Sequence, residues 1–443
     1  MLDIKFIREH PDRVKEGVAK KGVSFDVDYL LALDEKRRAK LREVEEFRAR
    51  QNTASSEVSG LEGLERNTKL AESKDLKAKL GELEFELKAL ADEFDGLLLL
   101  LPNLPLPDVP AGKDEGENVV LREMGEKPTF ASTPRDYLEI ANALGLVDTE
   151  RAAKVSGTRF GYLTREAALL EFALVSFAFS FLADRKRLAS VISEAGLAAP
   201  DAPFIPVVPP VLVKPEAMRA MGYVERGGDE IYLVERDQLY LVGTSEQSIG
   251  PMHAGETLEE ASLPLRYAAF SSCFRREAGS YGRDTKGILR VHQFDKVELF
   301  SYVLPERSAD EHRFLLALEE ALFGALGIPY RVVQVCAGDL GDPAAAKFDL
   351  EAWLPGQSGG RGEWREMTST SNTTDFQARR LGIKFKRKNG ATEYVHMLNG
   401  TAFAIGRTLI AILENYQQED GSVKIPKALQ PHLNGITEIR RQN

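Results

Sequence analysis

Apolar residues near the N-terminus follow a heptad pattern. Eight of them alternate in steps of four and three residues: Leu76, Leu80, Leu83, Leu87, Leu90, Phe94, Leu97 and Leu101. A seam held this long predicts a coiled-coil helix. An upstream stripe, interrupted by Arg37, predicts the partner helix: Leu30, Leu33, Leu41 and Val44. The polar stretch between them, residues 52–68, is expected to form the turn of an antiparallel hairpin, with an ordinary helical bundle as the alternative.

The pattern changes after residue 101. The segment PNLPLPDVPAGKDEGEN, residues 102–118, holds four prolines and two glycines and predicts a linker. Beyond it, helical stretches such as 165–184 alternate with short strands rich in Val, Ile, Tyr and Phe, and residues 227–247 are typical of a hairpin. We therefore predict an α+β fold with a helical arm at residues 1–101 and a domain of antiparallel β-sheet with flanking helices at residues 119–443.

Composition narrows the class of protein. The 443 residues are 43% hydrophobic and 28% charged, and no run of about 18 apolar residues predicts a membrane span. The charged N-terminus lacks the apolar stretch of a signal peptide, and two cysteines, Cys273 and Cys336, cannot form a disulfide framework, so we expect a cytoplasmic protein. The net charge of −10 argues against a protein that coats nucleic acid without specificity. It does not exclude a local basic patch that binds one specific nucleic acid.

A different pattern runs through residues 274–300, FRREAGSYGRDTKGILRVHQFDKVELF. From residue 290 to 298 the alternation predicts a strand with one face made of Arg290, His292, Phe294, Lys296 and Glu298. The preceding strand is expected to carry on one face Cys273, Arg275 and Glu277. The segment 278–287 would close a hairpin between these strands.

Such a surface suits a nucleotide together with a carboxylate substrate. Guanidinium groups bind phosphate and carboxylate oxygens in a bidentate manner, and an aromatic ring can stack on a base. The alternative is a solvated strand face with cross-strand ion pairs. Because the sequence has neither a GxxxxGK[ST] loop nor a strand–GxGxxG–helix unit, a nucleotide here would be held by side chains on antiparallel strands.

The whole stretch FRREAGSYGRDTKGILRVHQFDKVE resembles motif 2 of the class II aminoacyl-tRNA synthetases, and closely that of the seryl-tRNA synthetases. Residues 396–417, HMLNGTAFAIGRTLIAILENYQ, are similar to motif 3, with Arg407 pointing away from the apolar stripe of the expected helix. Residues 204–218, FIPVVPPVLVKPEAM, are similar to motif 1, which in the family lies at the dimer interface. Further family blocks are resembled by YLVGTSEQ, WREMTSTSNTTDFQARR and LPNLPLPDVPAG. The resemblance thus covers nearly the whole chain.

The resemblance implies a class II catalytic domain behind a tRNA-binding coiled-coil arm. It implies activation of L-serine by ATP to seryl-adenylate, then transfer of serine to the 3′ end of tRNA(Ser), with tRNA(Sec) as a second acceptor in the family. A cytoplasmic homodimer that uses ATP and Mg²⁺ is expected. Two alternatives stay open: a catalytically inactive tRNA-binding paralogue, and an amino-acid:carrier-protein ligase, whose relatives lack the arm.

The resemblance also implies residue roles. The catalytic arginines would be Arg275, Arg290 and Arg407. The ATP-binding set would be Arg275, Arg276, Glu277, Val291, Phe294, Glu366, Met367, Thr368, Ser369 and Arg407, in which Mg²⁺ is held by Glu366 and Ser369. The serine-binding set would be Thr244, Ser245, Glu246, Arg275, Glu298, Asn399 and Thr401.

The arm is less basic than a tRNA-binding element would suggest. Residues 51–100 hold 6 Lys or Arg against 11 Asp or Glu. Contacts with tRNA phosphates would therefore depend on a few residues around the turn, and the candidates are Arg48, Arg50, Arg66, Lys69 and Lys74. The alternative is that these residues only keep the helices solvated. Within the motif 2 loop, Tyr281 stands where the family has a small residue.

Overall fold

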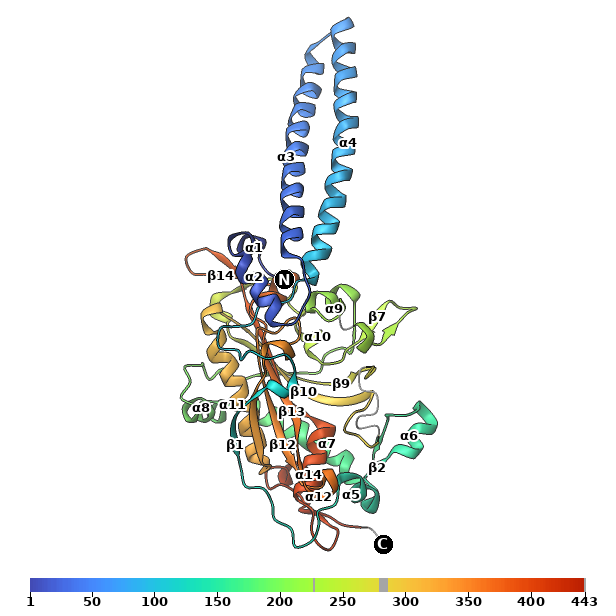
Figure 1. Ribbon diagram of the computed structural model, residues 1–443, viewed down its shortest axis with the longest axis vertical. Helices are drawn as coiled ribbons and strands as arrows, with labels where there is room; N and C mark the ends of the chain where they lie inside the picture. The colour runs from blue at the N-terminus through green and yellow to red at the C-terminus, as the bar shows by residue number, and fades with distance from the viewer. Residues whose placement is uncertain (226–227, 279–285, 442–443) are drawn as a thin grey trace. The chain divides into compact units, whose positions relative to one another are not determined.

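The computed structural model describes residues 1–225, 228–278 and 286–441, and the chain forms two compact units, Met1–Pro102 and Asn103–Asn443 (Figure 1). Tyr281 and most of the segment expected to close the motif 2 hairpin lie outside the described residues. Among the described residues no single helix is long and apolar enough to cross a membrane, although α7 (Glu166–Leu182) and α8 (Arg185–Glu194), bent by 77°, pass that test together on length and composition.

The first unit is the predicted helical hairpin. Two short helices, α1 (Ile4–Glu9) and α2 (Pro11–Lys20), precede the long helices α3 (Val27–Glu57) and α4 (Gly63–Leu100). The long helices are joined by the ion pairs Lys40–Glu86 at 2.8 Å and Lys69–Glu57 at 2.9 Å. Residue 40 of α3 is thus paired with residue 86 of α4, and the later residue 57 is paired with the earlier residue 69. The two long helices are therefore antiparallel, as predicted.

The apolar seam holds the hairpin together. Leu80 and Leu83 of α4 pack on Val44 of α3. Arg37, which interrupts the stripe, places its guanidinium 4.5 Å from the ring centre of the buried Phe94. The turn was predicted too long, because α3 continues to Glu57 and only residues 58–62 connect the helices. The small polar residues before it are helical, and the Ser55 and Ser73 hydroxyl oxygens lie 3.0 Å apart across the two helices.

An antiparallel sheet forms the centre of the second unit, which confirms the predicted α+β fold. Its eight strands follow the order β1-β11-β12-β13-β16-β10-β9-β4. All neighbours are antiparallel except β4 and β9. The strands are β1 (Val119–Met124), β4 (Ile205–Val207), β9 (Leu265–Phe274), β10 (Gln293–Val303), β11 (Tyr330–Gln334), β12 (Ala346–Leu354), β13 (Glu363–Asn372) and β16 (His396–Ala404).

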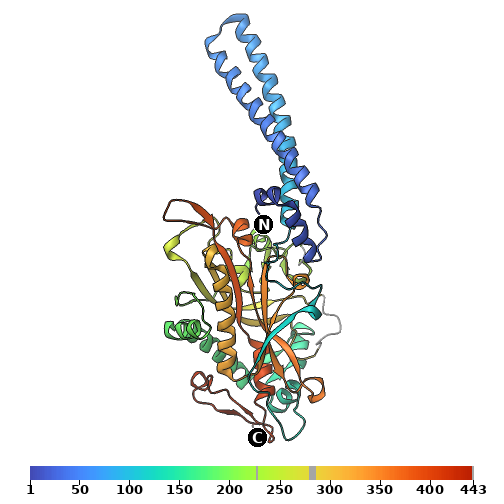
Figure 2. The ribbon, with the colours of Figure 1, turned by 60° about the vertical axis from the view of Figure 1, so that its left-hand side comes forward.

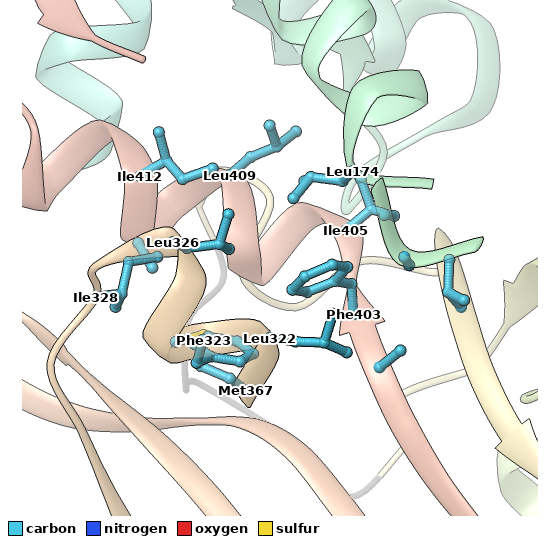
Figure 3. Packing of buried hydrophobic residues seen from close by; sticks show 14 of the residues in the cluster. Leu174, Leu322, Phe323, Leu326, Ile328, Met367, Phe403, Ile405, Leu409 and Ile412 are labelled. Carbon is cyan, nitrogen blue, oxygen red and sulfur yellow. The ribbon is translucent and has the colours of Figure 1, made fainter. Parts of the chain in front are cut away.

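Helices α7, α11 (Ser308–Leu326) and α14 (Ile405–Asn415) pack against this sheet. Figure 2 shows α11 lying along the strands. In Figure 3, Leu322 and Phe323 of α11 meet Phe403 at the end of β16. The predicted apolar stripe of α14 is buried at Ile405 and Leu409, each 1% exposed. Burial of this stripe fixes the rotation of α14 about its axis.

Smaller elements surround the sheet. The strands β6 (Leu233–Val234) and β7 (Leu239–Leu241) form the predicted hairpin. The rest are α5 (Tyr137–Leu144), β2 (Val147–Asp148), α6 (Thr149–Ser156), β3 (Tyr162–Leu163), β5 (Leu212–Val213), α9 (Pro215–Met221), α10 (Glu246–Ile249), β8 (Thr257–Glu259), α12 (Gln357–Gly360), α13 (Phe376–Leu381), β14 (Lys384–Lys386), β15 (Thr392–Tyr394), β17 (Val423–Lys424) and β18 (Glu438–Ile439).

The proline-rich segment is fixed to the second unit from residue 103 onward. The Asn103 amide donates to the carbonyl oxygens of Pro343 and Thr373, both at 2.9 Å. The Leu106 N–H donates to the Ala345 carbonyl at 2.8 Å. The segment expected as a linker at residues 102–118 therefore follows a defined path along the second unit from residue 103 onward.

The two motif 2 strands are shorter than predicted. Strand β9 ends at Phe274 and β10 begins at Gln293, so Arg275, Glu277 and Arg290 lie just beyond the sheet. One further backbone bond, from Arg275 N–H to His292 O at 2.9 Å, keeps the two chains together. Glu277 has a φ of 51°, and this left-handed conformation ends the extended run. The predicted alternation holds for Phe294, which stands opposite Cys273 in the register.

Candidate active site

Most of the predicted residues line one cavity of about 970 Å³. They are Thr244, Glu246, Arg275, Glu277, Arg290, Val291, Phe294, Glu298, Glu366, Met367, Thr368, Ser369, Asn399, Thr401 and Arg407. Ser245 and Arg276 are outside the lining. Ser245 is fully buried with its hydroxyl 3.5 Å from the Ala269 carbonyl oxygen, and Arg276 is exposed. The sheet thus gathers one face of residues that lie far apart in the sequence.

Arg275 and Phe294 form the first part of the cavity. The Arg275 Nε donates to the Gly243 carbonyl oxygen at 3.1 Å, which fixes the guanidinium. Its central carbon lies 5.3 Å from the centre of the Phe294 ring, within cation–π distance. This arrangement leaves an aromatic face beside a fixed positive charge, which suits a base and a phosphate.

Glu277 and Arg290 form an ion pair at 3.6 Å between Oε2 and Nη1. Their side chains are 15% and 32% exposed, so both are accessible from the cavity. Arg159, which the sequence analysis did not single out, donates to the Glu277 carbonyl oxygen at 3.2 Å. Arg290 therefore has a carboxylate partner in this structure.

Arg407 and Glu366 form the opposite part of the cavity. Arg407 Nη1 donates to the Glu366 carbonyl oxygen at 2.8 Å and lies 3.4 Å from its carboxylate. Burial opposes the charge of Glu366, but the positive charges of Arg407, Lys347 and Arg275 outweigh it and lower its pKa to about 2. Glu366 is therefore ionised, with a 47% exposed side chain facing the open cavity.

The residues near Glu366 fit a magnesium ion. Ser369 stands opposite Asp349 of β12 in the register, and Asp349 is 3.1 Å from the Lys347 ammonium. Burial, together with the charge of Glu366, raises the pKa of Asp349 to about 6 although Lys347 opposes this. Carboxylate and hydroxyl oxygens are hard ligands of the kind Mg²⁺ prefers. No group of three His, Cys, Asp or Glu side chains suited to a metal occurs among the described residues, so an ion here would complete its coordination with phosphate and water oxygens.

Glu298 forms the centre of the third part of the cavity. It is 3% exposed and accepts hydrogen bonds from Thr244 Oγ1 at 2.9 Å and from Thr401 Oγ1 at 3.3 Å. The Lys296 ammonium contacts the same carboxylate. Burial, followed by the nearby charge of Arg275, lowers the pKa of Lys296 to about 8. This pocket can recognise a small group that carries a hydroxyl or an ammonium.

The sequence analysis missed the residues that hold Glu246. Its carboxylate accepts from the Tyr223 hydroxyl at 2.9 Å and from the Gln377 amide at 3.0 Å. Thr373 donates to Gln377 at 3.0 Å in turn. Burial raises the pKa of Glu246 against these hydrogen bonds. Gln377 lies inside the quoted block DFQARR and could have been found there, whereas nothing in the sequence distinguishes Tyr223.

The arm candidates differ in how far they are already paired. Arg48 forms an ion pair with Glu84 at 2.6 Å, and Lys69 pairs with both Glu57 and Glu72. The Arg50 guanidinium lies 5.5 Å from the Phe47 ring centre. The remaining two candidates are exposed: Arg66 and Lys74.

Comparison with known proteins places both units. Residues 1–105 match the family model described as the seryl-tRNA synthetase N-terminal domain, and residues 232–416 match that of the tRNA synthetase class II core domain (G, H, P, S and T). The chain is 48% identical over 444 residues to a serine–tRNA ligase of Dictyoglomus turgidum, with 99% of each chain covered. It is 46% identical over 434 residues to that of Thermobifida fusca, covering 98% of this chain and 97% of the relative.

The chain belongs to the seryl-tRNA synthetase family. Solved structures of other seryl-tRNA synthetases agree with its fold. That of Pyrococcus horikoshii, complexed with ATP, is 41% identical with a TM-score of 0.86 and full coverage of both chains. The cytoplasmic serine–tRNA ligase of Naegleria fowleri, in complex with AMP, is 32% identical with a TM-score of 0.83, covering 100% of this chain and 99% of that one. The expected family membership is confirmed, and this seryl-tRNA synthetase chain is matched in its arm as well as in its core.

Proposed function

We propose that this chain activates L-serine with ATP and transfers the seryl group to tRNA(Ser), and that tRNA(Sec) is a second acceptor. The observation that carries the proposal is the buried carboxylate of Glu298, which two threonine hydroxyls hold in a cavity that Arg275, Arg290 and Arg407 also line. Relatives matched along 97–99% of their own length support it. An inactive paralogue or a carrier-protein ligase is not favoured, since the arm and the charged cavity are both present.

In the first step, a serine carboxylate oxygen attacks the α-phosphorus of ATP. The new P–O bond forms as the bond to the leaving pyrophosphate breaks, which gives seryl-adenylate. A carboxylate is already nucleophilic at neutral pH, so the chain needs to supply position and positive charge rather than a base. In the second step, a hydroxyl of the terminal ribose of tRNA attacks the acyl carbon, and AMP leaves.

The ATP subsite would use three arginines that line the cavity, Arg275, Arg290 and Arg407. Arg275 would bridge the α-phosphate and the serine carboxylate, while Phe294 stacks on adenine. Arg290 and Arg407 would bind the outer phosphates. Glu366 and Ser369 would hold a magnesium ion, which when bound neutralises phosphate charge; their oxygen donors support this assignment. The ordered guanidinium of Arg275 supports its role, because it needs no reorganisation before reaction.

The serine subsite would read the side-chain hydroxyl through buried polar groups. Glu298 and Thr401 would hydrogen-bond this hydroxyl, and Thr244 and Glu246 would bind the ammonium group. Alanine would then leave these buried groups without partners, which excludes it more strongly than a loss of packing would. Asn399, which also lines the cavity, completes the proposed set.

The arm would bind tRNA through a few placed cations. Arg66 and Lys74 of α4 are exposed candidates close to the turn. Replacing both by Ala should leave serine-dependent pyrophosphate exchange intact, raise KM for tRNA, and reduce the salt slope of tRNA binding by about 1 for each lost phosphate contact. Lys88→Ala, which removes an exposed cation paired with Asp92 on the same helix, is the control. An unchanged KM for tRNA would leave these residues with a solvating role only.

Exposed apolar residues support a homodimer. Leu169 and Phe172 of α7 are 51% and 64% exposed, and Ile205 of the edge strand β4 is 48% exposed. Ile205 belongs to the motif 1 region, and burial of these exposed side chains against a second copy would remove apolar surface from water. Sedimentation equilibrium measures the mass directly. Localisation in the cytoplasm stays a prediction.

The test of the proposed function is ATP–pyrophosphate exchange by the purified chain with serine, threonine, alanine and glycine in turn. Exchange with serine, followed by charging of tRNA, is the expected result. Exchange without charging would favour a ligase with another acceptor. No exchange with any of the four amino acids would reject the activity.

A further inference from the structure

Strands β13 and β16, which both line the cavity, each contain a β-bulge of one extra residue. Each bulge shifts the alternation of side chains along its strand. In β13, Leu350 and Glu351 of the neighbouring strand face Thr368 and Glu366, so Met367 is an extra residue. A single extra residue shifts the alternation of a strand by one. The carboxylate of Glu366 and the hydroxyl of Ser369 therefore both reach the cavity although three positions separate them.

Strand β16 contains a bulge of the same kind. Val297 and Glu298 of β10 face Phe403 and Thr401, so Ala402 is the extra residue. Both Ala402 and Phe403 belong to the apolar core, while Thr401 lines the cavity. Figure 3 shows Met367 and Phe403, one from each bulged strand, close to Leu322 and Phe323 of α11. The core side of both bulges is therefore covered by one helix.

The two bulged strands separate from each other at this point. They pair only from Thr370 to Asn372 on β13, opposite residues 400 to 398 of β16. Beyond that, the Thr401 N–H has lost the ladder partner that a continuous pair would supply. We call this opening, bounded by Thr368 and Thr401, the strand fork.

Glu319 of α11 fills the strand fork. Its Oε1 accepts from the Thr401 N–H at 3.1 Å, and its Oε2 accepts from the Thr368 hydroxyl at 2.7 Å. The carboxyl group is 0% exposed, and it approaches so closely that a Cβ on Gly400 would lie 2.9 Å from Oε1. One buried side chain thus joins the strand of the ATP subsite to the strand of the serine subsite.

A purely structural filler at this position would be apolar. Leu315 and Leu322, one turn away on either side of Glu319, are fully buried and apolar. Burying a carboxyl group disfavours folding unless its hydrogen bonds repay the desolvation, and burial raises the pKa of Glu319 well above its usual range. What an apolar side chain could not do is bind the two donors of the strand fork.

We propose that Glu319 is a positioning residue that sets the spacing between the Glu366–Ser369 pair and Thr401 by hydrogen-bonding both bulged strands at once. The inference rests on the proposed function, because it concerns how the ATP and serine subsites are aligned. It predicts that loss of Glu319 disturbs both subsites together, whereas a residue inside one subsite would affect one ligand only.

The test compares three variants by pyrophosphate exchange and by the rise in Tm that ligands cause. In Glu319→Leu, the KM for serine and the half-saturating Mg²⁺ concentration should rise together, with kcat/KM lower by about 10²-fold. Serine, and separately a non-hydrolysable ATP analogue with Mg²⁺, should each raise Tm less than in the unmodified chain. Glu319→Gln keeps an acceptor for Thr401 and a polar partner for Thr368. It should therefore restore most of the exchange activity and most of the rise in Tm that each ligand causes.

Ser308→Ala is the matched control, because it removes another buried hydrogen bond of α11, the one to Asn372 at 3.1 Å, outside the strand fork. It should lower the Tm of the ligand-free chain without changing the rise in Tm caused by serine or by the ATP analogue with Mg²⁺. A Glu319→Leu chain with normal ligand responses and only a lower Tm would overturn the proposal, as would a Gln variant as impaired as the Leu variant. If Glu319→Leu fails to fold, Thr368→Val must show the same joint loss, and unchanged responses in it would also overturn the proposal. Absence of exchange in the unmodified chain would instead reject the proposed function.

Discussion

Replacing Glu298 by Gln tests the proposed serine subsite. The carboxylate is 3% exposed and receives hydrogen bonds from Thr244 and Thr401, and Lys296 contacts it. Gln keeps the size and one acceptor oxygen but removes the negative charge. Serine should therefore lose a charge-assisted hydrogen bond, while ATP, whose proposed subsite does not include Glu298, should be little affected.

The magnitude follows from the burial of this group. A hydrogen bond to a charged partner contributes about 1.5–3 kcal/mol and one to a neutral partner about 0.5–1.5 kcal/mol. Loss of the charge alone should therefore cost about 1–1.5 kcal/mol, which corresponds to a rise in the KM for serine of about 5- to 12-fold. Glu298→Ala would be less informative, because it removes both acceptor oxygens and leaves the donors Lys296, Thr244 and Thr401 without this partner, whereas Gln keeps one amide oxygen for them. Gln is therefore the cleaner replacement.

The assay is pyrophosphate exchange with serine and ATP varied in turn. Asp295→Asn is the matched control, since it makes the same chemical change on the same strand at a position that does not line the cavity. A serine KM that stays within the range of this control, or an equal rise in the KM values for serine and ATP, would refute the role of Glu298 in serine recognition.

Three further predictions concern single residues. Arg275→Ala should abolish exchange, because the guanidinium would stabilise charge at the α-phosphate, and near-normal exchange would exclude that role. Tyr223→Phe removes the hydroxyl that donates to Glu246 at 2.9 Å; loss of about 1.5 kcal/mol should raise the serine KM about tenfold with ATP unaffected, and an unchanged serine KM would count against it. Burial raises the pKa of Glu414 from 4.5 to about 7, so the folded chain binds a proton at this group more tightly than the unfolded chain does. The stabilisation that this proton provides is fully present below pH 4.5 and is lost as the pH rises through 7. In chemical unfolding, the stability difference between the unmodified chain and Glu414→Gln should therefore fall by about 3 kcal/mol over that range, and a constant difference would contradict the assigned pKa.

Two features of the site were only partly predictable. The alternation of residues 294–298 correctly gave the cavity-facing side of β10, because side chains of a strand alternate wherever the strand is regular. The same reasoning could not show that Arg290 lies beyond the strand and pairs with Glu277. The family resemblance placed Ser245 in the serine subsite, whereas its hydroxyl lies 3.5 Å from the Ala269 carbonyl oxygen and does not line the cavity.

The sequence by itself determined the elements whose cause is local. The heptad seam of α4, the stripe that turns Arg407 of α14 away from the core, and the alternation in β10 each arise from a repeat within a few residues, and the structure has all three. Only the tertiary structure decided the bulge at Met367 and the place of Glu319 between two strands. A bulge changes which face a side chain takes, and a contact over 82 residues depends on every turn between its ends, so neither leaves a periodic signal in the chain.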